Sequence, residues 1–287
     1  MNNIEDFLKN NKELINNFAE NYIENIEFPS ILKESVKYSL VNDGKKLRPL
    51  IFLAMLDHYG YDYKNFLDIA LSIELVHTYS LVHDDLPAMD NDDYRWGKFT
   101  NHKVYGEEVA ILTGDAMQTL AYNIISKNDI LEDSIKIRLI MLLSDYSGVN
   151  GMLAGQIYDI KQDSYYVDEN YLENMHNLKT GKLITLPLIF AAIISNNDND
   201  IEFLTSYGYD LGLAYQIKDD ILDYYGDFKL TGKKFSDEDM ITYLSFYGIE
   251  KCEELLDLHT EKAKSYASKL NNSLLNDFAS LLLSRQK

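Results

Sequence analysis

The stretch Glu74–Arg95 reads ELVHTYSLVHDDLPAMDNDDYR and joins an apolar helix to an acidic cluster. Its first half places apolar residues at helical spacing, and its second half holds five aspartates within ten positions. Carboxylates packed this closely repel one another and raise each other's pKa, so such a cluster beside an apolar helix needs a cation. Because the ligands on offer are oxygens, the pattern favours Mg²⁺.

Asp84 and Asp90 are six positions apart in this stretch. An unbroken helix would therefore point their side chains about 120° away from each other. Pro87 lies between them and cannot donate to the hydrogen-bond ladder of a helix. We expect a bulge or kink at Pro87 that brings Asp90 back to the face of Asp84.

A second acidic cluster ends the segment Gly212–Asp223, which reads GLAYQIKDDILD. Asp219 and Asp223 are one helical turn apart and share a face, whereas Asp220 lies to the side. Either cluster alone could equally be a solvated acidic face or a helix end. Two such clusters in hydrophobic helices, more than 130 positions apart, together indicate a site for two or three metal ions.

The composition favours one large helical domain. The 287 residues are 46% hydrophobic, enough for a substantial core, and the 4 prolines and 14 glycines form no linker. Apolar residues recur at helical spacing, as in Ile51, Ala54 and Met55, and strand-like alternation is rare. We therefore predict an all-α bundle of ten or more helices over residues 1–287, with breaks near Gly44, at Gly106 and at 195–200.

Charge and cysteine usage exclude several classes of protein. The formal net charge of −19, without a dense basic run, argues against a nucleic-acid partner. The single cysteine, Cys252, excludes an intrachain disulfide framework and a cysteine-rich metal site, and fits a reducing cytoplasm. The first ten residues do not resemble a signal peptide, and the apolar run LPLIFAAII is too short to span a bilayer. We expect a cytoplasmic protein without stable membrane insertion.

A metal site that binds a polyanion such as a diphosphate also needs fixed cations. The segment Gly44–Pro49, GKKLRP, places Lys45 and Arg48 three positions apart at a helix start, where backbone N–H groups favour anions. His77 lies two helical turns before Asp84 on the same face. By themselves, these are more often a solvated basic turn and a packed histidine.

Five segments together resemble the short-chain trans-isoprenyl diphosphate synthases, in particular the bacterial farnesyl diphosphate synthase (geranyltranstransferase) type. The resemblance covers residues 44–243, and the stretch Glu74–Arg95 is its most specific part. The segments are GKKLRP, ELVHTYSLVHDDLPAMDNDDYR, GEEVAILTGDAM, LKTGKL and GLAYQIKDDILD.

This resemblance implies an all-α fold with a deep central cavity, two aspartate motifs across its mouth, and a homodimer. It also implies an enzyme that ionises an allylic diphosphate and condenses it with isopentenyl diphosphate, using three Mg²⁺ ions once substrate is bound. The implied metal ligands are Asp84, Asp85, Asp90, Asp219, Asp220 and Asp223. The residues implied to hold the two diphosphates are Arg95, Lys179, Thr180 and Gln216 for the allylic substrate, and Lys45, Arg48 and His77 for isopentenyl diphosphate.

Product length is implied by the residue five positions before the first aspartate, which in this family closes the cavity floor. Here it is Tyr79, so we expect a fifteen-carbon product, farnesyl diphosphate, made from dimethylallyl or geranyl diphosphate. The resemblance further implies that Asp84, Asp90, Arg95, Lys179 and Asp219 are the catalytic residues.

Two positions depart from the family pattern. Trp96 stands where a second arginine is usual, and Met240 occupies the place of a lysine before Ile241-Thr242-Tyr243. Each lost charge-assisted contact is expected to weaken binding by about 1.5–3 kcal/mol, with Lys233 or Lys234 as candidate replacements for the second. The alternatives are a geranyl or geranylgeranyl diphosphate synthase, a terpene cyclase of the same fold, or a non-catalytic subunit of a heteromeric synthase.

Overall fold

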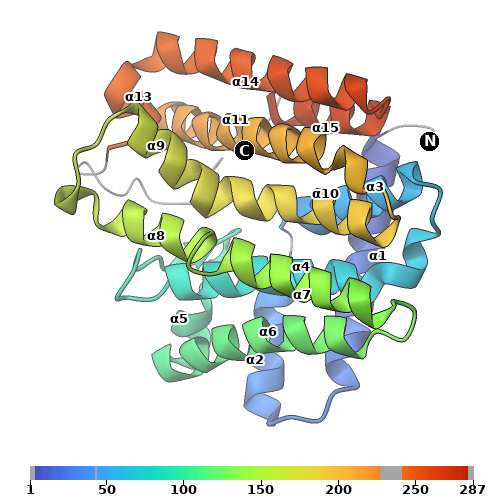
Figure 1. The fold of residues 1–287 in the computed structure, drawn as a ribbon. Helices are drawn as coiled ribbons and strands as arrows, with labels where there is room; N and C mark the ends of the chain where they lie inside the picture. Colours follow the sequence, from blue (N-terminus) through green and yellow to red (C-terminus); the bar gives the residue numbers. More distant parts are fainter. Residues whose placement is uncertain (1–3, 43, 227–240, 284–287) are drawn as a thin grey trace. The chain divides into compact units, whose positions relative to one another are not determined.

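The computed structural model describes residues 4–42, 44–226 and 241–283 (Figure 1). These residues form α-helices joined by short turns, with one two-stranded hairpin, so the predicted all-α fold with more than ten helices is confirmed. The chain packs internally as two compact units, one up to Ile140 and one from Met141 on. The single domain over residues 1–287 stays a prediction.

The first unit is built around one buried helix, α4. Its elements are α1 (Ile4–Glu24), α2 (Ser30–Leu40), α3 (Leu47–His58), η1 (Tyr63–Phe66), α4 (Leu67–Asp84), β1 (Tyr94–Arg95), β2 (Lys98–Phe99), α5 (Asn101–Tyr105) and α6 (Glu107–Lys127). Helices α1, α2, α3 and α6 all contact α4, and buried residues such as Leu71, Ile73 and Val76 lie on its different faces. A helix that is apolar all round belongs in a core, so the acidic cluster follows the central helix of this unit.

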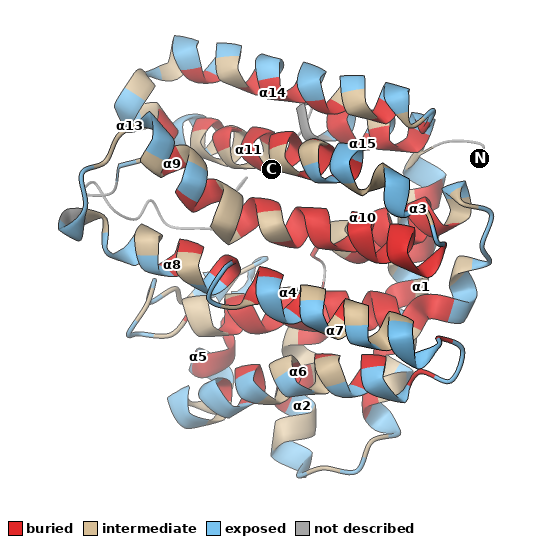
Figure 2. Cartoon of the chain, viewed as in Figure 1, coloured by how far each residue is buried: buried red, intermediate tan, exposed pale blue. Residues whose placement is uncertain are grey.

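The second unit is layered around α10 and α11. Its elements are α8 (Met152–Ile160), η2 (Gln162–Ser164), α9 (Glu169–His176), η3 (Asn177–Gly181), α10 (Lys182–Ile194), η4 (Asp198–Asp200), α11 (Ile201–Tyr225), α13 (Tyr243–Tyr247), α14 (Ile249–Lys269) and α15 (Ser273–Leu283). Helix α7 (Asp133–Ser147) contains the boundary between the two units. Helix α10 is buried along almost its whole length (Figure 2), and α11 packs against α10, α14 and α15.

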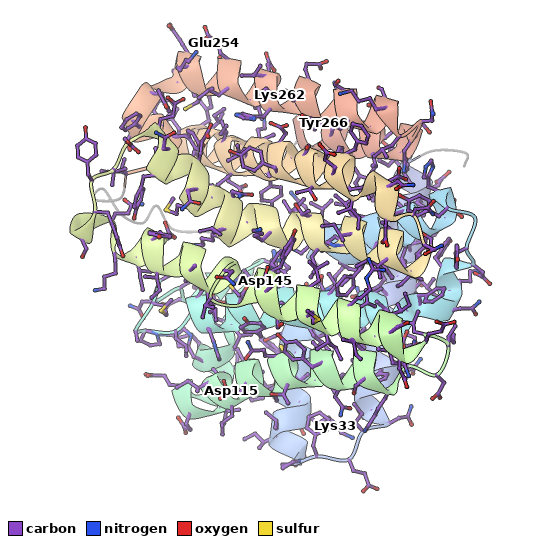
Figure 3. All side chains as sticks on the ribbon, viewed as in Figure 1. Lys33, Asp115, Asp145, Glu254, Lys262 and Tyr266 are labelled. Carbon is purple, nitrogen blue, oxygen red and sulfur yellow. The ribbon has the colours of Figure 1, made fainter. Side chains whose placement is uncertain are left out.

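Helix α14 shows how an outer helix of this unit is specified. Cys252, Leu256 and Ala263 recur at helical spacing and are buried against the core. Glu254 and Lys262, on the opposite face, are exposed and point outward (Figure 3). The amphipathic pattern of the sequence therefore fixes which side of α14 covers α11.

One helical stretch, Glu169–Ile194, runs through α9, η3 and α10 without a break. By length and composition, these 26 residues are long and apolar enough to cross a membrane. The run LPLIFAAII, which forms only the last part of this stretch, is too short by itself. However, 78% of the most apolar window of Glu169–Ile194 is buried inside the protein. That burial is typical of the core helix of a globular protein.

A buried ion pair connects two helices of the first unit. Lys46 has a left-handed backbone, with φ of 52°, directly before α3. Its Nζ donates to Glu74 Oε1 at 3.0 Å and to the backbone oxygen of Leu40 at 2.7 Å. The side chains of Lys46 and Glu74 are only 1% and 4% exposed. The pair therefore holds the end of α2 and the start of α3 against α4.

Substituting Glu74→Leu is expected to lower the free energy of unfolding by about 3–5 kcal/mol, because the Lys46 ammonium then stays buried without a carboxylate. The double variant Lys46→Met/Glu74→Leu should recover most of that loss, since no charge is left in the core. Denaturant unfolding measures both. Lys37→Met, which breaks an exposed pair with Glu24, is the control and should have little effect. A Glu74→Leu loss no larger than the control would contradict the structural role of the pair.

His176 is a buried histidine in the core of the second unit. Its ring stacks on Tyr243 with centroids 5.2 Å apart. Among the described residues neither ring nitrogen has a hydrogen-bond partner. Burial lowers the pKa of His176 to about 4, with Lys179 adding to the shift and Asp159 opposing it. The ring is therefore neutral in the folded protein at pH 7.

The low pKa of His176 predicts a loss of stability in mild acid. Below about pH 6.5 the unfolded chain binds a proton that the folded protein excludes, so the stabilisation present at neutral pH falls as the pH drops toward 4. Between pH 7 and 5 this contribution is about 2 kcal/mol. His176→Phe should keep the ring stack and remove this part of the pH dependence, measured as unfolding free energy against pH. His58→Phe, at an exposed position, should leave the pH dependence unchanged; an identical curve for wild type and His176→Phe would contradict the prediction.

Candidate functional site

The first aspartate cluster forms a tight turn at the end of α4. The helix ends at Asp84, shortly before Pro87. The proline ring makes the helical conformation unfavourable for the residue before it, so the helix cannot continue up to Pro87. The backbone N–H of Asp90 donates to the carbonyl oxygen of Asp84 at 2.8 Å, and Asn91 has a positive φ of 52°. Asp90 therefore returns to Asp84 through a turn after the helix, whereas we expected a bulge or kink within it.

Basic residues compensate part of this cluster. The guanidinium of Arg95 grips Asp85, with Nε 2.7 Å from Oδ1 and 2.9 Å from Oδ2, and its Nη2 lies 3.5 Å from Asp92 Oδ2. Lys103 Nζ lies 3.0 Å from Asp93 Oδ1. The Asp85 side chain is 4% exposed, so in this state its carboxylate anchors Arg95. Arg95, in turn, is held between Asp85 and Asp92 and lies close enough to Asp84 to feel its charge.

Three cations surround His77 in the first unit. Burial lowers the pKa of His77 well below its ordinary value, and the positive charges of Arg48, Lys46 and Arg95 lower it further. His77 is therefore a neutral hydrogen-bonding group among cations. Lys45, next to the buried Lys46, is exposed at the loop surface. Lys46 and Arg95 are paired with Glu74 and Asp85, so Arg48 and Lys45 are the cations of this group that suit an anion site.

Tyr79 lies one helical turn before His83 on α4 and is buried, with 3% of its surface exposed. Its hydroxyl accepts a hydrogen bond from Gln118 Nε2 on α6 at 3.3 Å, and its ring packs edge-on against His83 at 5.9 Å. Burial raises the pKa of the Tyr79 hydroxyl. The residue is thus a rigid, neutral side chain held by two helices.

The second aspartate cluster occupies the last turns of α11. Asp219 is partly exposed and Asp223 is exposed, so both can reach a ligand from the same face of the helix. Asp220 points elsewhere, as predicted: its Oδ2 accepts the backbone N–H of Tyr243 at 2.9 Å, at the start of α13. Burial, with Asp223 and Asp159 nearby, raises the pKa of Asp220 to about 7. This carboxyl is the one that most needs a cation in order to ionise fully.

Lys179 and Thr180 lie in η3, which is a π-helical turn between α9 and α10. Thr180 Oγ1 donates to Gln216 Oε1 at 2.9 Å, and Lys179 Nζ contacts Asp159 Oδ2. Gln216 is one turn before Asp220 on α11, so the turn connects the basic and acidic parts of the second unit.

Two glycines let neighbouring helices approach this π-helical turn. A Cβ atom at Gly155 of α8 would lie 2.2 Å from the backbone nitrogen of Lys179, and one at Gly212 of α11 would lie 2.7 Å from Gly181 Cα. Side chains at either glycine would force the helices apart. The widened turn is therefore fixed by close packing on both sides, and such turns often occur at functional sites.

Each unit thus carries an acidic cluster with basic side chains beside it. Among the residues that the structure describes, no three His, Cys, Asp or Glu side chains gather closely enough to hold a metal ion. The donors in both clusters are carboxylate oxygens, which fit Mg²⁺.

Sequence reasoning missed three features that shape these clusters: the Lys46–Glu74 pair, the π-helical turn, and the Lys179–Asp159 contact. The spacing of Lys45, Lys46 and Arg48 shows three cations but not which one is buried. Met240, Lys233 and Lys234, which we singled out as a departure and its candidate replacements, lie outside the described residues. Trp96 is described and lies directly after Arg95 in a two-residue turn.

Comparison with known proteins gives one consistent result. The polyprenyl synthetase family profile matches residues 29–274. The chain is 44% identical to the farnesyl diphosphate synthase of Micrococcus luteus over 259 residues, covering 88% of this chain and 89% of that one. It is 38% identical to the farnesyl diphosphate synthase of Bacillus subtilis over 292 residues, covering 99% of each.

Solved structures agree. A geranyltransferase from Legionella pneumophila superposes with a TM-score of 0.86 at 31% identity, covering 98% of this chain and 95% of that one. A geranyltransferase from Helicobacter pylori, complexed with magnesium and isoprenyl diphosphate, superposes with a TM-score of 0.82 at 30% identity, covering 96% of each chain. The chain therefore belongs to the polyprenyl synthetase family, as its motifs predicted.

Proposed function

We propose that this protein is a trans-prenyltransferase that condenses isopentenyl diphosphate with dimethylallyl or geranyl diphosphate to give farnesyl diphosphate. The observation that carries the proposal is the turn that brings the backbone of Asp90 back to Asp84, directly before Asp85 with its bound Arg95. The names of the similar proteins from Micrococcus luteus and Bacillus subtilis support the product. The structure from Helicobacter pylori, with magnesium and isoprenyl diphosphate bound, supports the cofactor and the substrate class.

Mg²⁺ is the proposed cofactor, with three ions once substrate is bound. The residues that would hold it are Asp84, Asp85, Asp90, Asp219, Asp220 and Asp223. When bound, Mg²⁺ neutralises charge on a diphosphate and stabilises it as a leaving group. Asp85 needs to exchange part of its contact with Arg95 to take this role, and Asp220 needs to lose its proton fully.

The chain's own cations do the rest of the diphosphate binding. Arg95 and Lys179 are both held by carboxylates in this state, Asp85 and Asp159, so they are oriented before the allylic diphosphate binds. Thr180, directly after Lys179, forms a hydrogen-bonded pair with Gln216. Fixed donors of this kind stabilise the negative charge that develops on the leaving diphosphate without having to reorganise.

Isopentenyl diphosphate is assigned to the cationic cluster of the first unit. Lys45 and Arg48 supply charge, and neutral His77 supplies a hydrogen bond. The allylic carbon–oxygen bond breaks, the isopentenyl double bond attacks the resulting carbocation, and a proton passes to the released diphosphate. No protein nucleophile is needed, so the apolar wall around Tyr79 serves to exclude water from the cation.

The remaining assignments follow from this function. We propose a single domain with a central cavity, a cytoplasmic location, no nucleic-acid partner and a homodimer. The exposed apolar side chains Ile111 and Leu112 on α6, 45% and 58% exposed, and Ile137 on α7, 57% exposed, suit a subunit interface. Burial raises the pKa of the Cys252 thiol to about 11, which keeps it in its unreactive form.

The proposed function is tested by incubating the purified full chain with isopentenyl diphosphate, either allylic diphosphate, and Mg²⁺. A fifteen-carbon diphosphate is expected, with loss of turnover in EDTA and recovery on adding Mg²⁺. Consumption of the allylic substrate without isopentenyl diphosphate would instead identify a terpene cyclase. Turnover only after an active synthase is added would identify a non-catalytic subunit.

Asp84→Ala and Asp219→Ala are each expected to lower kcat/KM by about a hundredfold or more, because the metal ions lose a ligand in one of the two clusters. The thermal midpoint should stay the same or rise, since removing one of several clustered carboxylates relieves repulsion. Glu254→Ala, an exposed carboxylate on α14 (Figure 3), is the control. A large fall in the thermal midpoint with activity retained would assign these aspartates a structural role.

Tyr79→Ala should lengthen the product beyond fifteen carbons, because Tyr79 is the proposed floor of the prenyl pocket. The measurement is the chain length of dephosphorylated products by chromatography. Tyr166→Ala, which removes a tyrosine that is 88% exposed, should leave the distribution unchanged. An unchanged distribution in Tyr79→Ala would place the floor elsewhere.

A further inference from the structure

Trp96 has an unfavourable backbone conformation. Strands β1 and β2 pair with Tyr94 opposite Phe99 and Arg95 opposite Lys98, which leaves Trp96 and Gly97 as a two-residue turn. Their φ angles are 50° and 76°. Turns with positive φ at both positions favour Asn-Gly or Asp-Gly, and a tryptophan there is strained. A strained conformation of this kind persists only where contacts with the surrounding structure hold the residue in place.

The indole of Trp96 rests on Gly44. A Cβ atom built on Gly44 would lie 3.2 Å from Cζ2 and 3.4 Å from Cε2 of Trp96, and 2.6 Å from Asn42 Oδ1. Gly44 does not have a positive φ, so its backbone conformation does not require a glycine. The close approach of the ring and of Asn42 explains why no side chain fits there.

Hydrogen bonds also fix this segment. The backbone N–H of Gly44 donates to Asn42 Oδ1 at 2.7 Å. Lys46 reaches Asn42 Oδ1 at 3.3 Å and Glu74 Oε1 at 3.0 Å, in the buried pair described above. The segment Gly44–Arg48 is therefore held both by these hydrogen bonds and, at Gly44, by the Trp96 ring.

The hairpin that carries Trp96 is itself anchored to two helices. Arg95, directly before Trp96, binds Asp85 at the end of α4. The backbone oxygen of Phe99 accepts the hydroxyl hydrogen of Tyr38 on α2 at 2.6 Å. Trp96 lines the same small pocket as Thr78 of α4, the residue after His77. Because the hairpin is fixed to two helices, the Trp96 ring can hold the loop at Gly44 in place.

We propose that Trp96 is a positioning residue for isopentenyl diphosphate: its indole braces Gly44 and thereby holds Lys45 and Arg48 where they meet the diphosphate. This inference rests on the proposed function. Trp96 stands where the family pattern has a second arginine. In this chain the residue at that position orders the neighbouring cations by packing.

Trp96→Asn is the decisive variant, because asparagine suits a left-handed turn and removes only the ring. With geranyl diphosphate saturating, the KM for isopentenyl diphosphate should rise about tenfold, since the cations lose their alignment. The KM for geranyl diphosphate and kcat should stay within about twofold, and the thermal midpoint should be unchanged or higher. Trp96→Phe should restore a KM for isopentenyl diphosphate within about threefold of wild type, because a ring again covers Gly44.

Tyr94→Leu is the matched control: it removes a ring that stacks on Phe99 at 4.7 Å in the same hairpin, and it should change neither KM. The proposal is overturned if Trp96→Asn leaves the KM for isopentenyl diphosphate unchanged, or if both KM values and the thermal midpoint worsen together. If wild type does not condense the two substrates, the proposed function fails by itself. In that case the inference is tested by calorimetry with inorganic diphosphate. Trp96→Asn should bind inorganic diphosphate about tenfold more weakly than wild type. Equal binding by the two proteins, or no binding by either, would refute the inference.

Discussion

The repulsion between carboxylates at the ends of two apolar helices constrains most of what this chain does. At the end of α4, five aspartates follow a helix that is buried on all sides, and the fold offsets part of their charge with Arg95 and Lys103. In the second unit Asp220 is held by a backbone N–H and retains a pKa near 7 because it is buried. Both clusters are therefore stable enough to fold, and the negative charge that remains on them is what the proposed Mg²⁺ ions would offset.

The same electrostatic logic explains the buried cations. Lys46 supports no substrate directly, because Glu74, Leu40 and Asn42 occupy its donors, yet it fixes the loop that carries Lys45. Lys179 and Arg95 are each paired with a carboxylate. These ion pairs keep both side chains ordered, so in the proposed reaction a diphosphate would need only to exchange partners with them.

The sequence predicted those features that depend on local periodicity. Helical spacing identified α4 and α11, and the positions of Asp219, Asp220 and Asp223 on α11 follow from 100° per residue. Other features depend on contacts between distant residues. The Lys46–Glu74 pair spans 28 positions, and the turn at Lys179 requires Gly155 and Gly212 to lie against it. At Trp96, local preference gives the wrong residue for the turn, and only the contact with Gly44 accounts for it.

The π-helical turn at Asn177–Gly181 has a consequence for which changes this region tolerates. A turn of this type contains one more residue than an α-helical turn, so removing a residue would restore regular winding. Because the wide turn takes up the extra residue, α9 would keep nearly the same rotation relative to α10 after such a deletion. What would be lost is the widened backbone that carries Lys179 and Thr180. The extra residue therefore shapes the backbone locally at these two side chains, while the packing of the helices on either side does not depend on it.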